Sequence, residues 1–158
     1  MLSNLVYPAM VIVFLFEQGI PPTATNAAAK ATSTSTASAA TVKPAEANLI
    51  EVEKQMLEKT NAQRARYGLP PLVVDRSLIQ TARSHAAWMT NTQTLQHTSK
   101  NVGENIAMGQ HTTDEAVSDW MASPGHRANI LNSGYKRTGV AAYRTKDGTV
   151  YWCQQFLP

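Results

Sequence analysis

Two histidines and one glutamate are the residues of this sequence whose side chains could do chemistry. His97 and Glu104 lie seven residues apart in HTSKNVGENIA, and His126 follows in SPGHRANIL. Neutral imidazoles and carboxylates bind zinc-like divalent ions, and the same groups can act as a general acid and base. The spacing alone leaves two alternatives open. Either the three side chains meet at one site, or each has a local role, such as a loop hydrogen bond for His97 and a cap or amide acceptor for Glu104.

Other common catalytic and binding motifs are missing from the sequence. It has no HExxH helix, no paired-cysteine motif, no glycine-rich phosphate loop and no nucleophile elbow. The single cysteine, Cys153, excludes an internal disulfide framework and a Cys-rich zinc site. Because Cys153 alternates within the strand-like segment VYWCQQF, we expect a buried thiol without chemistry.

Two helices are predicted in the first half of the domain. Apolar residues recur at helical spacing from about 48 to 67, where Gly68 can end the helix. A second helix is predicted from a cap at Asp75 or Ser77 to Met89. His85 shares the apolar face of that helix, so we interpret it as a hydrogen-bonded core or boundary histidine and leave it out of the site.

A third and a fourth helix would position His126. Thr112 and Glu115 form a capping box in which the two side chains satisfy reciprocal backbone donors, so Glu115 has a structural role. Ser123 and Pro124 end that helix and can start the next one as its N-cap and first residue. His126 then lies in the first turn, where the helix dipole favours the neutral ring that a metal requires.

The remaining segments complete an α+β pattern. Residues 90–111 lack helical periodicity and are predicted to form a long surface loop with at most a short turn. The segments GVAAYR and TVYWCQQF, joined by a turn at 146–148, predict a β-hairpin. Helices first and strands last indicate helices packed on a small antiparallel sheet.

The first third of the chain does not have a globular pattern. The apolar run at 5–16 is too short to span a bilayer and predicts a signal peptide over 1–20, although a retained N-terminal anchor is the alternative. Residues 21–45 are rich in Ala, Thr, Ser and Pro and predict a disordered linker. We therefore expect a secreted or extracytoplasmic protein with no membrane span after processing. Residues 46–158 carry twelve basic and ten acidic residues without a basic run, which indicates no nucleic-acid partner.

The order of several motifs resembles a known family. The segments NAQRARYGLPPL, LQHTS, VGENIA, AVSDWMASPGHRANIL, GVAAYR and YWCQQF are similar to those of the CAP superfamily, the SCP-like proteins founded on cysteine-rich secretory, antigen-five and pathogenesis-related-one proteins. The chain most resembles the disulfide-free bacterial branch. The resemblance covers Leu49 to Phe156 and implies an α-β-α sandwich with a central antiparallel sheet and a cleft lined by two histidines and two acidic residues.

Three of the four cleft residues have counterparts here. The resemblance assigns His97 to the first histidine, Glu104 to the glutamate of GEN and His126 to the histidine of GHxxNI. The second glutamate of the family is replaced by Ser123, and Glu115 does not align with it. The metal ligands predicted for a zinc-like ion are therefore His97 and His126, with Glu104 beside them.

The resemblance implies more than one function. The first hypothesis is a secreted binding module for a divalent metal and an unidentified extracellular ligand: a lipid, sterol, peptide or cell-envelope component. The second is a metal-dependent hydrolase or peptidase in which Glu104 is the general base. The third is a purely structural coat module. We favour the binding module because one carboxylate is missing and because a fold does not determine a chemistry.

Overall fold

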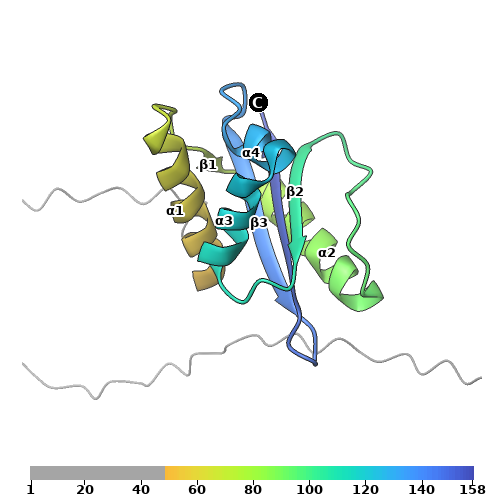
Figure 1. Cartoon of the computed structure of the whole chain (residues 1–158). Helices are drawn as coiled ribbons and strands as arrows, with labels where there is room; N and C mark the ends of the chain where they lie inside the picture. Colours follow the sequence, from red (N-terminus) through yellow and green to blue (C-terminus); the bar gives the residue numbers. More distant parts are fainter. Residues whose placement is uncertain (1–48) are drawn as a thin grey trace, which may run out of the picture.

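The computed structural model describes residues 49–158, so the signal peptide predicted at 1–20 and the linker at 21–45 lie outside the described residues. In chain order, the elements are α1 (Glu51–Arg66), β1 (Val73–Val74), α2 (Arg76–Thr92), β2 (Gly103–Met108), α3 (Thr113–Ala122), α4 (Pro124–Ile130), β3 (Arg137–Arg144) and β4 (Val150–Leu157). The predicted α+β class is confirmed (Figure 1).

The strands form one four-stranded sheet in the order β1-β3-β4-β2. The predicted hairpin is confirmed, because β3 pairs antiparallel with β4, and β2 also pairs antiparallel with β4. The two-residue strand β1 pairs parallel with β3, so the sheet is mixed rather than wholly antiparallel. α2, β2, α3 and α4 lie between β1 and β3 along the chain, and this long connection is of the kind that parallel strands require.

Helices cover both faces of the sheet and give the α-β-α sandwich. α2 packs on β3 and β4 from one side, while α1, α3 and α4 pack together on the other (Figure 1). Alternate residues of β4 face the two layers: Trp152 and Phe156 lie in the core with α1 and α3, and Cys153 lies in the core with α2. Among residues 49–158, no helix has both the length and the apolar character needed to cross a bilayer.

The helix ends agree closely with the predicted signals. Asp75 caps α2 by accepting hydrogen bonds from two amides of its first turn, and Gly68 follows α1 with a φ of +68°. Thr112 caps α3 by accepting from the Glu115 amide at 3.2 Å. The Glu115 carboxylate, however, accepts from the amide of His111 and not from that of Thr112, so the reciprocal bond of the capping box falls one residue earlier.

One face of α3 packs into the core of the domain. Ala116, Val117 and Trp120 of α3 are all buried, and the indole N–H of Trp120 donates to the carbonyl of Ile106 at 3.2 Å. This bond ties α3 to β2 and satisfies the one polar atom of a large core side chain.

The prediction of a loop over residues 90–111 is wrong at both ends of this range. α2 continues to Thr92, and residues 103–108 form strand β2 at an edge of the sheet. β2 is buried on both faces, so it shows no alternation of apolar and polar residues. Its polar residues Glu104 and Asn105 find their partners in other elements, which a local pattern cannot show.

Candidate functional site

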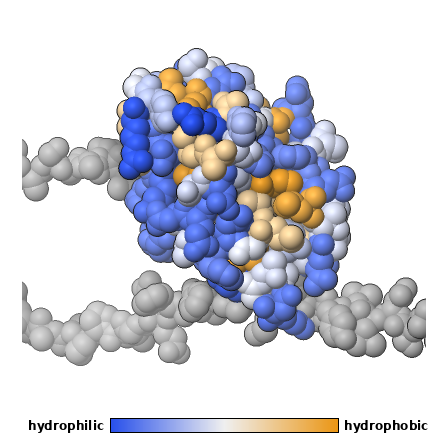
Figure 2. Space-filling model, in the orientation of Figure 1, coloured by the Kyte–Doolittle hydropathy of each residue, from blue (hydrophilic) through white to orange (hydrophobic). Residues whose placement is uncertain are grey.

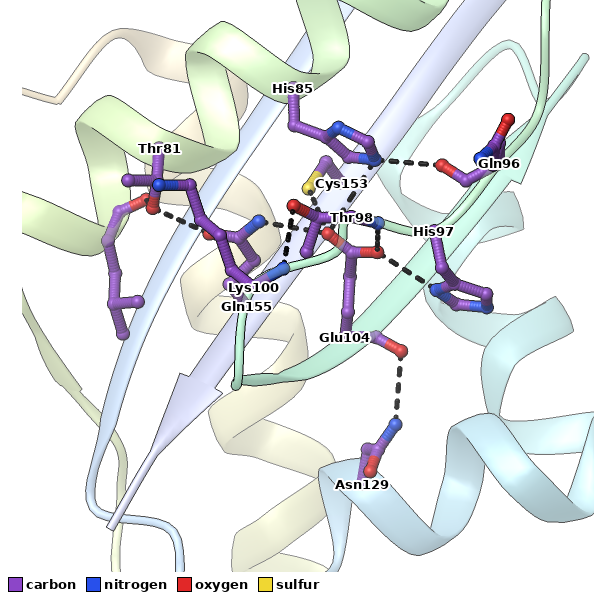
Figure 3. A network of polar contacts seen from close by, with 11 residues as sticks. Thr81, His85, Gln96, His97, Thr98, Lys100, Glu104, Asn129, Cys153 and Gln155 are labelled. Atoms are coloured by element: carbon purple, nitrogen blue, oxygen red, sulfur yellow. Dashed lines mark hydrogen bonds and ion pairs between the residues drawn. The ribbon is translucent and has the colours of Figure 1, made fainter.

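The carboxylate of Glu104 is the centre of the site. This buried side chain leaves β2 on the α2 side of the sheet (Figure 3). Its Oε1 accepts from His97 Nδ1 and from the amide of Thr98, both at 2.9 Å. Its Oε2 accepts from Gln155 Nε2 at 2.9 Å and from the Cys153 thiol at 3.7 Å. Glu104 therefore holds the segment that follows α2 against the sheet and has both oxygens engaged.

This bonding fixes which nitrogen of His97 is available. Because a carboxylate only accepts, Nδ1 of His97 carries the hydrogen, and the neutral ring keeps the lone pair on Nε2. The side chain is 58% exposed, so Nε2 can meet a ligand from solvent. A carboxylate that orients a histidine in this way is the usual outer partner of a metal-binding imidazole.

His126 lies in the first turn of α4 and is half-buried. Burial lowers its pKa below the ordinary histidine value, and the charge of a protonated His97 lowers the pKa further. The predicted preference for the neutral ring therefore has the right direction, but its cause is burial together with His97. Ser123 is the N-cap of α4 and Pro124 is its first residue, as predicted, although the Ser123 side chain makes no capping hydrogen bond.

Two asparagines attach α4 to β2. Asn129 Nδ2 donates to the Glu104 carbonyl at 3.1 Å (Figure 3) and to Asn105 Oδ1 at 2.9 Å. Asn105 Nδ2 in turn donates to the carbonyl of His126 at 3.1 Å. The GEN segment thus supplies Glu104 to orient His97 and Asn105 to hold the helix that carries His126.

Sequence reasoning did not connect His85 with this site. Its Nε2 donates to the carbonyl of Gln96 at 2.8 Å, as expected of a hydrogen-bonded boundary histidine, but the same nitrogen lies 3.8 Å from Glu104 Oε2 (Figure 3). The approach depends on how α2 packs across β4. A single helix pattern gives no signal of it.

Cys153 has the inert character that its strand position predicts. It is fully buried, and burial together with the charge of Glu104 raises the pKa of its thiol well above the ordinary value. Since the thiolate is the nucleophilic form, Cys153 is not a nucleophile at neutral pH.

Two imidazoles are the donors that the described residues could offer to a metal ion. His97 offers Nε2, His126 is biased toward its neutral form, and Glu104 acts from behind His97. Residues 49–158 contain no group of three or more His, Cys, Asp or Glu side chains placed to hold a metal ion. A bound ion would therefore complete its coordination with water or with a ligand, which leaves it open to exchange.

The comparisons with known proteins agree with this architecture. The family model of CAP, the cysteine-rich secretory protein family, matches residues 57–156. YkwD of Bacillus subtilis is 38% identical, over 66% of this chain and 46% of that protein.

Solved structures show the same fold. An extracellular protein containing a SCP domain from Bacillus anthracis has a TM-score of 0.60 and 28% identity, over 73% of this chain and 44% of that one. NaASP2, solved with Zn2+, has a TM-score of 0.58 and 16% identity, over 70% and 80% of the two chains.

The chain spans less than half the length of the curated relatives that it matches. The match to the family model nevertheless covers most of the chain, and it includes the segments that carry His97, Glu104 and His126. The chain therefore belongs to the CAP family, the cysteine-rich secretory protein family.

Proposed function

We propose that this protein is a secreted binding module that holds a divalent, zinc-like ion between His97 and His126 and presents it to an extracellular ligand. The observation that carries the proposal is the 2.9 Å hydrogen bond from His97 Nδ1 to Glu104. It leaves the lone pair of Nε2 available to bind a metal ion. The lowered pKa of His126 adds a second neutral imidazole. NaASP2, which shares the fold, was solved with Zn2+, and the Bacillus anthracis relative is an extracellular protein.

The hydrogen bonding of Glu104 favours binding over hydrolysis. A general base needs a lone pair directed at the water that it deprotonates. Both oxygens of Glu104 already accept hydrogen bonds, from His97 and Thr98 on one side and from Gln155 and Cys153 on the other. Ser123 occupies the position at which the family resemblance places a second carboxylate, so no second carboxylate assists Glu104 there.

The ligand that we propose for this binding module is a lipid, sterol, peptide or cell-envelope component.

Alanine variants of the two histidines test the proposal. His97→Ala and His126→Ala should each lower zinc affinity by about tenfold or more, since about 1.4 kcal/mol of lost interaction is tenfold. Glu104→Gln should weaken binding less, because it acts through His97 and not on the metal. Titration calorimetry measures the affinities, and circular dichroism checks the fold.

The matched control is His111→Ala, which removes an exposed histidine from the loop before α3. It should bind zinc like the wild type, with an affinity in the micromolar range, because two imidazoles give only a modest site. Equal zinc affinity in all four variants and the wild type would refute the metal site.

Zinc affinity should also depend on pH in a defined direction. Protons compete with the metal for the imidazole nitrogens, so affinity should fall as the pH drops below about 6.5, the ordinary histidine pKa. Because the pKa of His126 is lowered, its ring stays neutral further into the acid range, and the decline should continue below that value. Calorimetric titrations between pH 8 and pH 5 measure the effect. A constant affinity over this range would contradict histidine ligation.

A further inference from the structure

An open pocket of about 390 Å3 lies beside His97, between α2 and the segment that follows it. This volume is within the range of small-molecule binding sites, which is about 300–1,000 Å3. The pocket is lined by His85, Trp88, Gln96, His97, Thr98 and Ser99. It is thus formed by one helix and one loop and shares only His97 with the proposed metal site.

Trp88 gives the pocket a flat apolar surface. The residue is 41% exposed, and its ring stacks on His85 at 5.7 Å between centroids with planes 8° apart. His85 is itself fixed by its bond to the Gln96 carbonyl. The indole is therefore supported from one side while much of its surface remains open, an arrangement suited to contact with a ligand.

The indole N–H of Trp88 distinguishes it from the other two tryptophans. Trp120 donates to the carbonyl of Ile106, and Trp152 donates to the carbonyl of Gln110 at 3.0 Å; both rings are buried. Within residues 49–158, the indole N–H of Trp88 has no acceptor. A buried tryptophan usually has a partner for this group, as Trp120 and Trp152 do, whereas the exposed N–H of Trp88 is open to solvent or to a ligand.

The rest of the lining decides the chemistry of that ligand. Gln96, Thr98 and Ser99 offer neutral amide and hydroxyl groups. No lysine, arginine or acidic residue lines the pocket, and no aliphatic side chain does. An acyl chain would need an aliphatic wall, and a phosphate would need a cation or a set of amides. On the face of the molecule in Figure 2, hydrophobic residues form only small patches within a hydrophilic surface.

A sugar ring matches both parts of this lining. A pyranose has an apolar face of C–H groups, which can lie on an indole, and an edge of hydroxyls, which can bond to amides and hydroxyls. We propose that Trp88 and the surrounding pocket bind a sugar ring of an extracellular glycan. The inference rests on the proposed function as a binding module, because it names the ligand class, but it does not require the metal.

The test uses the full chain in EDTA, with tetramers of N-acetylglucosamine and of glucose as probes. At least one tetramer should shift the tryptophan emission and protect it from acrylamide, because Trp88 is the exposed tryptophan of residues 49–158. Trp88→Ala should lower the affinity measured by calorimetry by about tenfold or more, and Trp88→Phe, which keeps a flat ring, should lower it less. Tyr67→Ala, which removes an exposed aromatic ring at the end of α1, should bind like the wild type.

The outcomes separate this inference from the metal proposal. Saccharide binding that depends on Trp88 in EDTA supports the inference, whatever the zinc titrations show. Zinc binding through His97 and His126 without any saccharide binding overturns the inference and leaves the metal proposal intact. Saccharide binding that is equal in wild type and Trp88→Ala, or binding of dodecanoate in place of the saccharides, also overturns it.

Discussion

Replacing Arg64 with Met is expected to lower the free energy of unfolding by about 3 kcal/mol, because the buried carbonyl of Ile130 and three partly buried carbonyls would lose their donor. A buried polar group left without a partner costs about 1–3 kcal/mol, and a partly exposed one costs less because water replaces the donor. Relief from burying the guanidinium offsets part of this cost. Typical domains are stable by only about 5–15 kcal/mol, so the loss is a large fraction of the total and the variant should unfold at a clearly lower urea concentration.

The contacts of Arg64 explain the size of the effect. The side chain leaves α1 and is fully buried, and burial lowers its pKa. Its Nε donates to the carbonyl of Pro70 at 2.9 Å, and its Nη1 donates to those of Ile130 at 2.7 Å and Asn132 at 3.0 Å. Its Nη2 donates to the carbonyl of Tyr135 at 3.3 Å. One guanidinium therefore ties the segment after α1 to the segment that joins α4 to β3.

Arg66→Met is the matched control, because Arg66 lies two residues further along α1 and is exposed. Its stability should stay within about 0.5 kcal/mol of the wild type. Arg64→Lys should fall between the two, since an ammonium cannot reach carbonyls on both segments at once. Urea denaturation followed by circular dichroism gives the values. If Arg64→Met were as stable as Arg66→Met, the hydrogen bonds of Arg64 would not hold these segments together.

Local signals in the sequence were sufficient for the helices and the hairpin. Asp75, Thr112 and Pro124 begin α2, α3 and α4 as predicted, because capping and proline effects act within one helical turn. Arg64 lies within the first predicted helix, and it is buried. Nothing local, however, indicates that three of its partners are carbonyls 66 to 71 residues away.

The candidate site depends on contacts between residues of different elements, which local signals in the sequence do not show. The residues alone left open whether His97 and Glu104 meet, and only the family resemblance selected them as a pair; the structure joins them. Strand β2 was missed because its polar residues are satisfied by α4, β4 and the loop after α2. His85 was left out because its approach to Glu104 requires the position of α2 over the sheet.

The position of α2 over the sheet leaves no room for a side chain at Gly139 of β3. Gly139→Ala is therefore expected to lower the free energy of unfolding by about 3 kcal/mol or more, which is at or above the upper end of the usual cost of overpacking. A Cβ at this place in β3 would lie 2.1 Å from the carbonyl carbon of Leu78 and 2.4 Å from the amide nitrogen of Ile79. These are backbone atoms of the first turn of α2, so no side chain can rotate away. The helix itself would have to move off the sheet.

Gly125→Ala is a control variant whose stability is expected to change in the opposite direction. Gly125 lies inside α4, and a Cβ there would meet nothing within 4 Å. Alanine should therefore raise stability by about 0.5–1 kcal/mol, since glycine is the more costly residue inside a helix. Thermal unfolding measures both variants. A rise in melting temperature for Gly139→Ala would show that α2 does not rest on β3 at this point.

Displacement of α2 should also disturb the site, because the residue of β4 opposite Gly139 is Gln155. Gln155 accepts from the hydroxyl of Thr81 in α2 at 2.6 Å and donates to Glu104 at 2.9 Å. A helix pushed away from β3 would stretch the first bond and release the amide that holds Glu104. Any Gly139→Ala protein that stays folded should therefore bind zinc more weakly than Gly125→Ala, although neither glycine touches a histidine ring.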